Sequence, residues 1–212
     1  MRFTKLGHAC VRLEKDGAAL VLDPGAFSGE DALAGANAVL ITHEHFDHVD
    51  PDRLRAAMTA DPGLQLWTTA ALAEQFADLG SQVHAVTHGD TFTAAGFDVH
   101  CYGSEHAVLH QDIPLVANTG FMIDGEVFHP GDALTVPEDP VSTLLLPVNA
   151  PWLKLSEMID YARAVNAQRG YAIHDGLLNG TGVAVLSNWL GLATGPAGGT
   201  FTRVEPGVSA DL

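Results

Sequence analysis

The sequence has few cysteines, few basic residues and no long hydrophobic run. Only two of its 212 residues are cysteines, Cys10 and Cys101, and both lie beside apolar residues in strand-like segments. Such surroundings indicate buried, unreactive thiols and argue against a disulfide framework or a redox pair. The start MRFTKLGHACV also lacks the apolar core of a signal peptide. We therefore expect a cytoplasmic protein.

Basic residues are scarce relative to acidic ones. The chain has 10 Lys and Arg against 26 Asp and Glu, which gives a net charge of −16. This charge repels nucleic acid and anionic membrane surfaces, so neither is expected as a partner. No stretch reaches the 18 or so consecutive apolar residues of a transmembrane helix. A small-molecule substrate is the better expectation, and self-association into a homo-oligomer stays open.

Apolar residues make up 47 % of the chain, enough to form a substantial core. The sequence contains no internal repeat and no linker long enough to divide it, so we expect one domain over residues 1–212. The Gly-rich segment 194–201 is expected to be a loose loop or an edge strand.

The order of apolar patterns indicates an α/β fold. Hairpin-like segments open the chain, followed by strand and helix patterns over 35–80, hairpins over 90–103 and 119–132, and strand and helix patterns over 141–193. The helix over 69–80 is expected to close at Gly80, and another to start with Asp50 as its N-cap and Pro51 after it. Two similar halves of this kind predict a four-layer αββα sandwich, with two mixed sheets facing each other and helices outside.

Three histidines and an aspartate lie within the six residues HEHFDH, directly after an apolar strand-like run. His43 and His45 can point the same way, as residues two apart do in an extended chain, while Asp47 and His48 turn toward a second point nearby. Imidazole and carboxylate groups without nearby cysteine favour an open Zn²⁺ site, with Mn²⁺ or Fe²⁺ as substitutes. The cluster therefore predicts two divalent metal ions.

Further ligands are expected from polar residues at later strand ends. His106, Asp132 and His174 have this position. The simplest assembly gives one metal His43, His45 and His106, and the other Asp47, His48 and His174, with the Asp132 carboxylate between them. His110 is a rival to His106, because either could follow the same strand.

Two such ions would hold a bridging water and lower its pKa from 15.7 toward about 7. A metal-bound hydroxide could then attack a small-molecule lactone, ester or phosphoester, with Asp47 and Asp132 as catalytic residues. The sequence thus predicts a binuclear metal-dependent hydrolase.

The segment HEHFDH matches the HxHxDH signature of the metallo-β-lactamase superfamily, and His106, Asp132 and His174 follow in the order of its other ligands. Within that superfamily, LGHACVRLEKDGAALVLDPG, ITHEHFDHVDP and FHPGDAL resemble the small hydrolase branch similar to ascorbate-6-phosphate lactonase. The resemblance implies the αββα fold and a metal-dependent hydrolase. It also implies that Asp23 supports the histidine loop by hydrogen bonding and does not contact metal.

Several assignments stay open at this stage. A phosphodiesterase or nuclease, and a non-catalytic protein that binds metal and a ligand, are the alternative functions. His8 and His129 are either supporting partners or ordinary histidines at strand ends. Asn149 and Trp152 either line the pocket or belong to a loop packed on the next helix.

Overall fold

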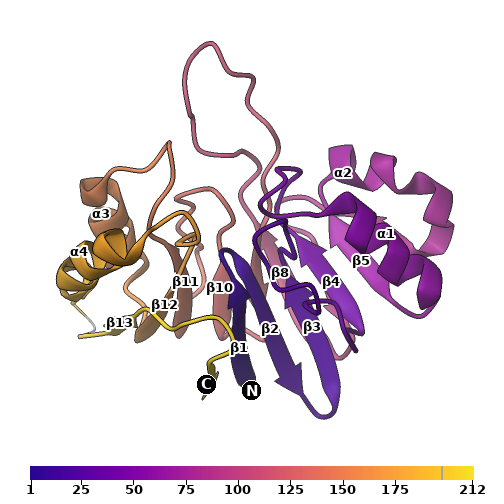
Figure 1. Cartoon of the computed structure of the whole chain (residues 1–212), viewed down its shortest axis with the longest axis horizontal. Coiled ribbons are helices and arrows are strands. Elements are labelled where there is room, and N and C mark those ends of the chain that lie inside the picture. The colour runs from indigo at the N-terminus through magenta and orange to yellow at the C-terminus, as the bar shows by residue number, and fades with distance from the viewer. Residues whose placement is uncertain (197) are drawn as a thin grey trace.

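The computed structural model describes residues 1–196 and 198–212 and contains two seven-stranded sheets with helices on their outer faces (Figure 1). In spatial order, the first sheet consists of β14 (Ser209–Asp211), β1 (Arg2–Gly7), β2 (Cys10–Lys15), β3 (Ala18–Leu22), β4 (Ala38–Ile41), β5 (Gln65–Thr68) and β6 (Val83–Ala85). The second consists of β13 (Thr200–Thr202), β12 (Arg169–Ile173), β11 (Thr143–Pro147), β10 (Val127–His129), β9 (Gly120–Ile123), β8 (Phe97–Tyr102) and β7 (Thr91–Ala94).

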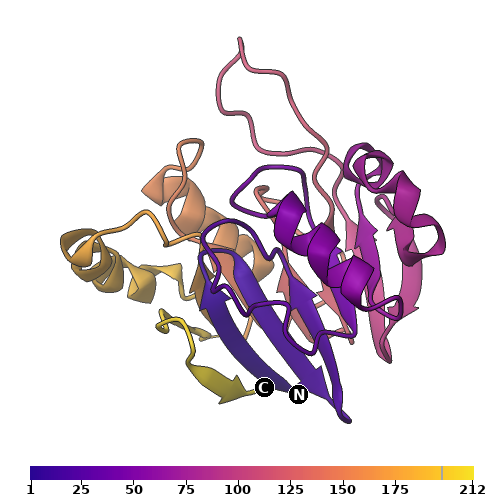
Figure 2. The same cartoon turned by 45° about the vertical axis from the view of Figure 1, so that its right-hand side comes forward.

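Both sheets are mixed. Strands β14 to β3 pair antiparallel and β3 to β6 pair parallel, while β7 to β10 pair antiparallel and β10 to β13 pair parallel. The first sheet carries α1 (Pro51–Ala60) and α2 (Ala70–Gln75), and the second carries α3 (Leu155–Val165) and α4 (Gly180–Leu190). Figure 2 shows the two pairs of helices on opposite sides of the sheets. The predicted αββα sandwich is confirmed.

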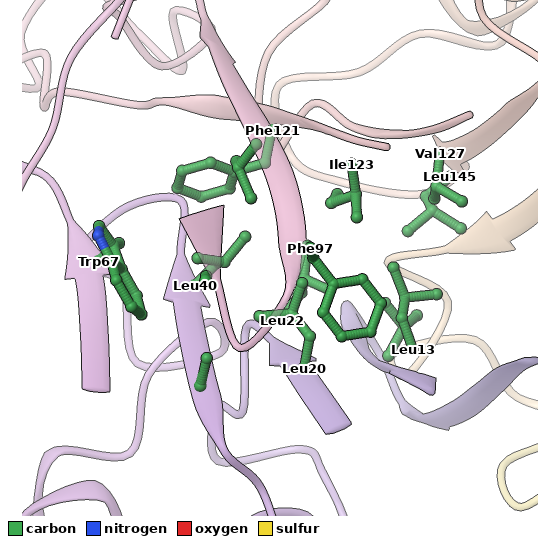
Figure 3. Packing of buried hydrophobic residues seen from close by; sticks show 14 of the residues in the cluster. Leu13, Leu20, Leu22, Leu40, Trp67, Phe97, Phe121, Ile123, Val127 and Leu145 are labelled. Atoms are coloured by element: carbon green, nitrogen blue, oxygen red, sulfur yellow. The ribbon is translucent and has the colours of Figure 1, made fainter. Parts of the chain in front are cut away.

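The sequence of strand β4 reflects its position between two layers of the sandwich. Ala38 and Leu40 pack into the core between the sheets, whereas Val39 and Ile41 pack beneath the helices of the first sheet. A strand buried on both faces needs apolar residues at every position, which produces the continuous run seen in the sequence. Figure 3 shows the core between the sheets, where Leu40 lies near Trp67 and Phe121.

Two elements differ from the expectations. The predicted helix over 69–80 ends at Gln75, and a 3-10 turn with non-helical backbone at Gly80 (φ 59°, ψ −121°) covers Ala77–Gln82. The Gly-rich segment 194–201 agrees with the expected edge strand, since it runs into β13 at the edge of the second sheet; Ala197 within it lies outside the described residues. A second 3-10 turn, Gly191–Ala193, follows α4.

The predicted start of α1 is confirmed, since the Asp50 side chain accepts a hydrogen bond from the Arg53 amide at 3.1 Å. Both cysteines are buried and free, and burial raises the pKa of Cys101 to about 12. None of the helices in the described part of the chain has the length and hydropathy to span a membrane.

Candidate metal centre

The seven predicted ligands meet at one edge of the sandwich, beyond the ends of strands from both sheets. We call this group the histidine–aspartate cluster; its members are His43, His45, Asp47, His48, His106, Asp132 and His174. The first four follow β4 of the first sheet, and the others follow β8, β10 and β12 of the second. The cluster therefore lies across the junction of the two sheets.

Possible ligand atoms form overlapping groups in which every atom lies within 4.8 Å of the others. One group is His43, His45 and His106, as the sequence predicted. A second contains Asp47, His48 and His174 and adds His8. Asp132 joins the two, because its carboxylate lies 3.1 Å from His48 Nε2 and 3.4 Å from His106 Nε2. His110 lies outside these groups, with its side chain exposed, so His106 is the better placed of the two rivals.

Four buried atoms in the cluster have no hydrogen-bond partner among the described residues: Nε2 of His48, His106 and His174, and Oδ1 of Asp132. Leaving a buried polar group unpaired costs about 1–3 kcal/mol. The unpaired nitrogens lie within 3.4 Å of the Asp132 carboxylate without hydrogen-bonding geometry. Their convergence indicates a shared cationic partner.

Hydrogen bonds on the opposite side of three rings fix which nitrogen faces the cluster. His106 Nδ1 lies 2.6 Å from the Ala107 carbonyl, and His174 Nδ1 lies 2.6 Å from the Asn149 carbonyl. His48 Nδ1 lies 2.7 Å from Asp23 Oδ2. Since a carbonyl or carboxylate accepts, each Nδ1 donates, and in the neutral ring Nε2 then has a free lone pair. The three rings are thereby oriented for coordination through Nε2.

Asp23 supports the loop as the resemblance implied. Its carboxylate accepts hydrogen bonds from the Thr42 amide and the Thr42 hydroxyl, both at 2.8 Å, in addition to the bond from His48. The Thr42 oxygen also lies 3.0 Å from His43 Nδ1. Asp23 and Thr42 therefore hold two ligand rings without facing the cluster themselves.

The surroundings shift the pKa values of the histidines in opposite directions. Burial lowers the pKa of His43 well below its usual value, so this ring is neutral and can coordinate a metal. For His174 burial also acts to lower the pKa, but the Asp132 and Asp47 carboxylates outweigh it and raise that pKa to about 9. In the absence of a cation this ring therefore holds a proton at neutral pH, which a divalent ion would displace.

Asp132 is held by two hydrogen bonds, to Asn118 and Trp152. Its amide donates to Asn118 Oδ1 at 3.0 Å, and its Oδ2 accepts from the Trp152 indole nitrogen at 2.9 Å. Gly131 before it has φ +64°, and a Cβ there would lie 2.2 Å from Asn118 Oδ1. The missing side chain of Gly131 therefore lets Asn118 approach the backbone closely.

Backbone strain gathers at the same edge. Asp23 and His174 have φ values of 46° and 61°, and His8 has 42°, a region that side chains other than glycine seldom occupy. Such conformations cost of order 1 kcal/mol each and persist where the surroundings impose them. Here the His174 amide donates to the His8 carbonyl at 3.0 Å, which joins two of the strained residues across the sheets.

Sequence reasoning left the roles of His8 and Trp152 open, and the structure places both beside the cluster. His8 Nδ1 accepts from the Gly176 amide at 3.1 Å, so its Nε2 carries the proton and donates to Asp47 Oδ2 at 3.3 Å. His129 instead lies behind the cluster, with Nε2 3.1 Å from the Ala9 carbonyl. In the sequence, all three residues lie at or after the end of a predicted strand. That position alone could not separate His8 and Trp152, which lie beside the cluster, from His129.

The chain is similar to known proteins in sequence and in fold. Residues 2–174 match the family model described as a beta-lactamase superfamily domain. Protein Rv0786c of Mycobacterium tuberculosis is 38 % identical over 184 residues, covering 84 % of this chain and 85 % of that protein. A Rhizobium etli protein named UPF0173 metal-dependent hydrolase is 32 % identical over 106 residues, covering 46 % of this chain and 44 % of its own length.

A solved structure, the metallo-beta-lactamase fold protein YhfI from Bacillus subtilis, superposes with a TM-score of 0.74 at 17 % identity. The match covers 99 % of this chain and 98 % of that one. It shows the same fold.

Proposed function

Since the chain belongs to the family of beta-lactamase superfamily domains, we propose that it is a metal-dependent hydrolase that binds two divalent ions in the histidine–aspartate cluster. The observation that carries this proposal is the convergence of four buried, unpaired nitrogen and oxygen atoms on one small volume. The name of the Rhizobium etli relative, metal-dependent hydrolase, supports the same reaction class.

The side chains of the cluster are of the kinds that bind divalent metal ions. His43, His45 and His106 would hold one ion, Asp47, His48 and His174 the other, and the Asp132 carboxylate would lie between them. Imidazole and carboxylate ligands without thiolate favour Zn²⁺, with Mn²⁺ or Fe²⁺ as substitutes. Three or four protein ligands for each ion leave coordination positions open for water and substrate, as a catalytic site requires.

Two bound ions would supply an activated water near neutral pH and a positive charge that polarises the bond under attack. The chain positions the other components. Asp23 and the Asn149 carbonyl orient the rings of His48 and His174, and Trp152 and Asn118 hold Asp132. Such preorganisation avoids reorganising polar groups during the reaction. The substrate we propose is a small-molecule lactone, ester or phosphoester.

Metal analysis of designed variants tests the proposal. The purified chain should bind about two divalent ions, and His43→Ala or Asp132→Ala should lose at least one of them. Hydrolysis of a 4-nitrophenyl ester should fall by more than about 100-fold in these variants, because loss of a ligand exceeds the 10–100-fold effect of losing an outer partner. His110→Ala is the matched control, since this histidine is exposed and outside the cluster.

Full metal content and full hydrolysis in both ligand variants would contradict the assignment. Full metal content in the parent chain together with no turnover of any lactone, carboxylic ester or phosphoester would instead support the non-catalytic alternative.

A further inference from the structure

A cavity of about 350 Å³ opens directly against the histidine–aspartate cluster. Four of its lining residues belong to the cluster: His45, Asp47, Asp132 and His174. The other lining residues are all apolar: Phe27, Phe46, Leu109, Pro151, Trp152 and Leu177. A group bound in this cavity would thus touch the cluster at one end and hydrocarbon or aromatic side chains at the other.

The apolar walls are partly open to water. Phe46 is 63 % exposed and Leu177 is 57 % exposed. Phe27 and Phe46 pack edge to face with ring centroids 5.4 Å apart, so the two rings form a continuous wall. Exposed apolar side chains that gather around one opening indicate a binding site for an apolar group.

The walls come from five separate segments, one of which carries Pro151 and Trp152 after β11. Phe27 follows β3, Phe46 follows β4, Leu109 belongs to the loop between β8 and β9, and Leu177 follows β12. The loop between β8 and β9 extends beyond the edge of the sheets in both views (Figures 1 and 2). It carries further exposed apolar residues, Val108, Ile113 and Leu115. The apolar character is therefore a property of the opening as a whole and not of one loop.

Basic side chains are missing from the same place. Among the described residues that line the cavity, none is Lys or Arg. Most basic residues elsewhere are already paired with a carboxylate, as Arg53 is with Asp50 and Arg203 with Asp175, and the whole chain has a net charge of −16. A phosphate group away from the reacting bond would find no counter-charge on the protein, so a phosphorylated substrate fits this opening poorly.

We propose that the substrate is an uncharged carboxylic ester, thioester or lactone with a hydrocarbon chain, and that the chain lies between Phe46, Trp152 and Leu177. This inference rests on the proposed hydrolase function and narrows its substrate class. In the reaction, water adds to the acyl carbon and the bond from that carbon to the alcohol oxygen or thiol sulfur breaks. The leaving group takes one proton, and a second proton is released as the acid ionises to a carboxylate.

A chain-length series tests the proposal on the zinc-loaded protein. From 4-nitrophenyl acetate through butyrate to octanoate, kcat/KM should rise about fourfold for each methylene that the cavity buries. 2-Decanone, an uncharged analogue with no leaving group, should bind in calorimetry without any turnover, which gives a measurement independent of catalysis.

Substitution of one wall residue makes the test specific. Leu177→Ser should reduce the ratio of octanoate to acetate kcat/KM by about tenfold and weaken 2-decanone binding by a similar factor. Leu192→Ser is the matched control, because Leu192 is a 45 % exposed leucine outside the cavity lining. It should change neither the ratio nor the binding.

The outcomes separate this inference from the proposed function. A flat dependence on chain length, absence of 2-decanone binding, or faster cleavage of 4-nitrophenyl phosphate than of the octanoate would overturn the apolar substrate class and leave the hydrolase intact. No turnover of any carboxylic ester or phosphoester by the zinc-loaded protein would overturn both.

Discussion

Trp152 connects the wall of the cavity with the candidate metal centre. Its indole nitrogen donates to Asp132 Oδ2 at 2.9 Å, while its side chain lines the cavity. Buried indole groups normally find such a partner for their single N–H group. Here the partner is the carboxylate proposed to lie between two ions. Trp152 would therefore influence the metal centre by positioning Asp132, without itself binding an ion.

Trp152→Phe should separate these two functions, because phenylalanine keeps an aromatic wall and removes the donor. We expect metal affinity to fall about tenfold, at the lower end of the effect of losing an outer partner of a ligand. A competition titration with a zinc-binding dye measures this, and circular dichroism checks the fold. Unchanged affinity in the folded variant would show that the hydrogen bond does not position Asp132.

Which residues could be identified from sequence depended on their spacing. HEHFDH contains four candidate ligands within six positions, and His106, Asp132 and His174 each follow an apolar run. His8 and Trp152 had no comparable signal, because their contacts with Asp47 and Asp132 span 39 and 20 positions along the chain. Such contacts follow from the packing of the sheets, which local patterns do not encode.

At the scale of elements, the loop after β3 and the loop carrying HEHFDH pack against each other at Gly25. A Cβ at this position would lie 2.0 Å from the Asp47 carbonyl oxygen and 2.5 Å from the His48 amide nitrogen. The Ala26 amide also donates to the Phe46 carbonyl at 2.8 Å. The loop carrying HEHFDH can thus lie in this position only because Gly25 in the adjacent loop has no side chain.

Gly25→Ala should displace this loop, since the clash is with backbone that cannot rotate away. We expect a loss of about 3 kcal/mol in the free energy of unfolding, at the upper end for overpacking, together with weaker metal binding. Urea unfolding and metal titration measure the two effects. Gly180→Ala, at the start of α4 with nothing within 4 Å of the added Cβ, should be neutral or slightly stabilising. Equal stability of the two variants would contradict the argument.

Elements were predictable where burial imposed a pattern. Strand β4 has a continuous apolar run because it is buried on both faces, and helix α3 has clear apolar periodicity because one face packs on the sheet. Strand β14 was not predicted, since Ser209–Asp211 is short, partly exposed and contains a single apolar residue, Ala210. It is a strand because the backbone of β1 pairs with it, through Phe3 opposite Ala210, and such pairing has no signature in the residues themselves.

At the scale of the whole molecule, the histidine–aspartate cluster joins the two sheets. His43, His45 and His48 come from the first sheet, and His106, Asp132 and His174 from the second. Ions bound there would add to the stability of the native state by mass action, because the unfolded chain does not hold the ligands together. The sandwich should therefore be less stable without metal.

Removal of metal should lower the melting temperature. Ions at about 1,000 times their dissociation constant stabilise by about 4 kcal/mol, and each 1 kcal/mol shifts Tm by about 2–4 °C in a chain of this size, so we expect a fall of about 8–16 °C. Scanning calorimetry with and without a chelator measures it, with metal content checked in parallel. The double variant His43→Ala/Asp132→Ala should respond much less to the chelator. Identical melting of the metal-loaded and metal-free parent would contradict the prediction.

The strand order has a further consequence for the unpaired backbone at the sides of the sandwich. The four outermost strands are β14, β6, β13 and β7, and they contain only three or four residues each. Long exposed edge strands are templates on which another chain can add its own strand and begin to aggregate. Because the edge strands of both sheets are short, they offer little unpaired backbone to a neighbouring copy of the chain. The two seven-stranded sheets are therefore protected against edge-to-edge aggregation.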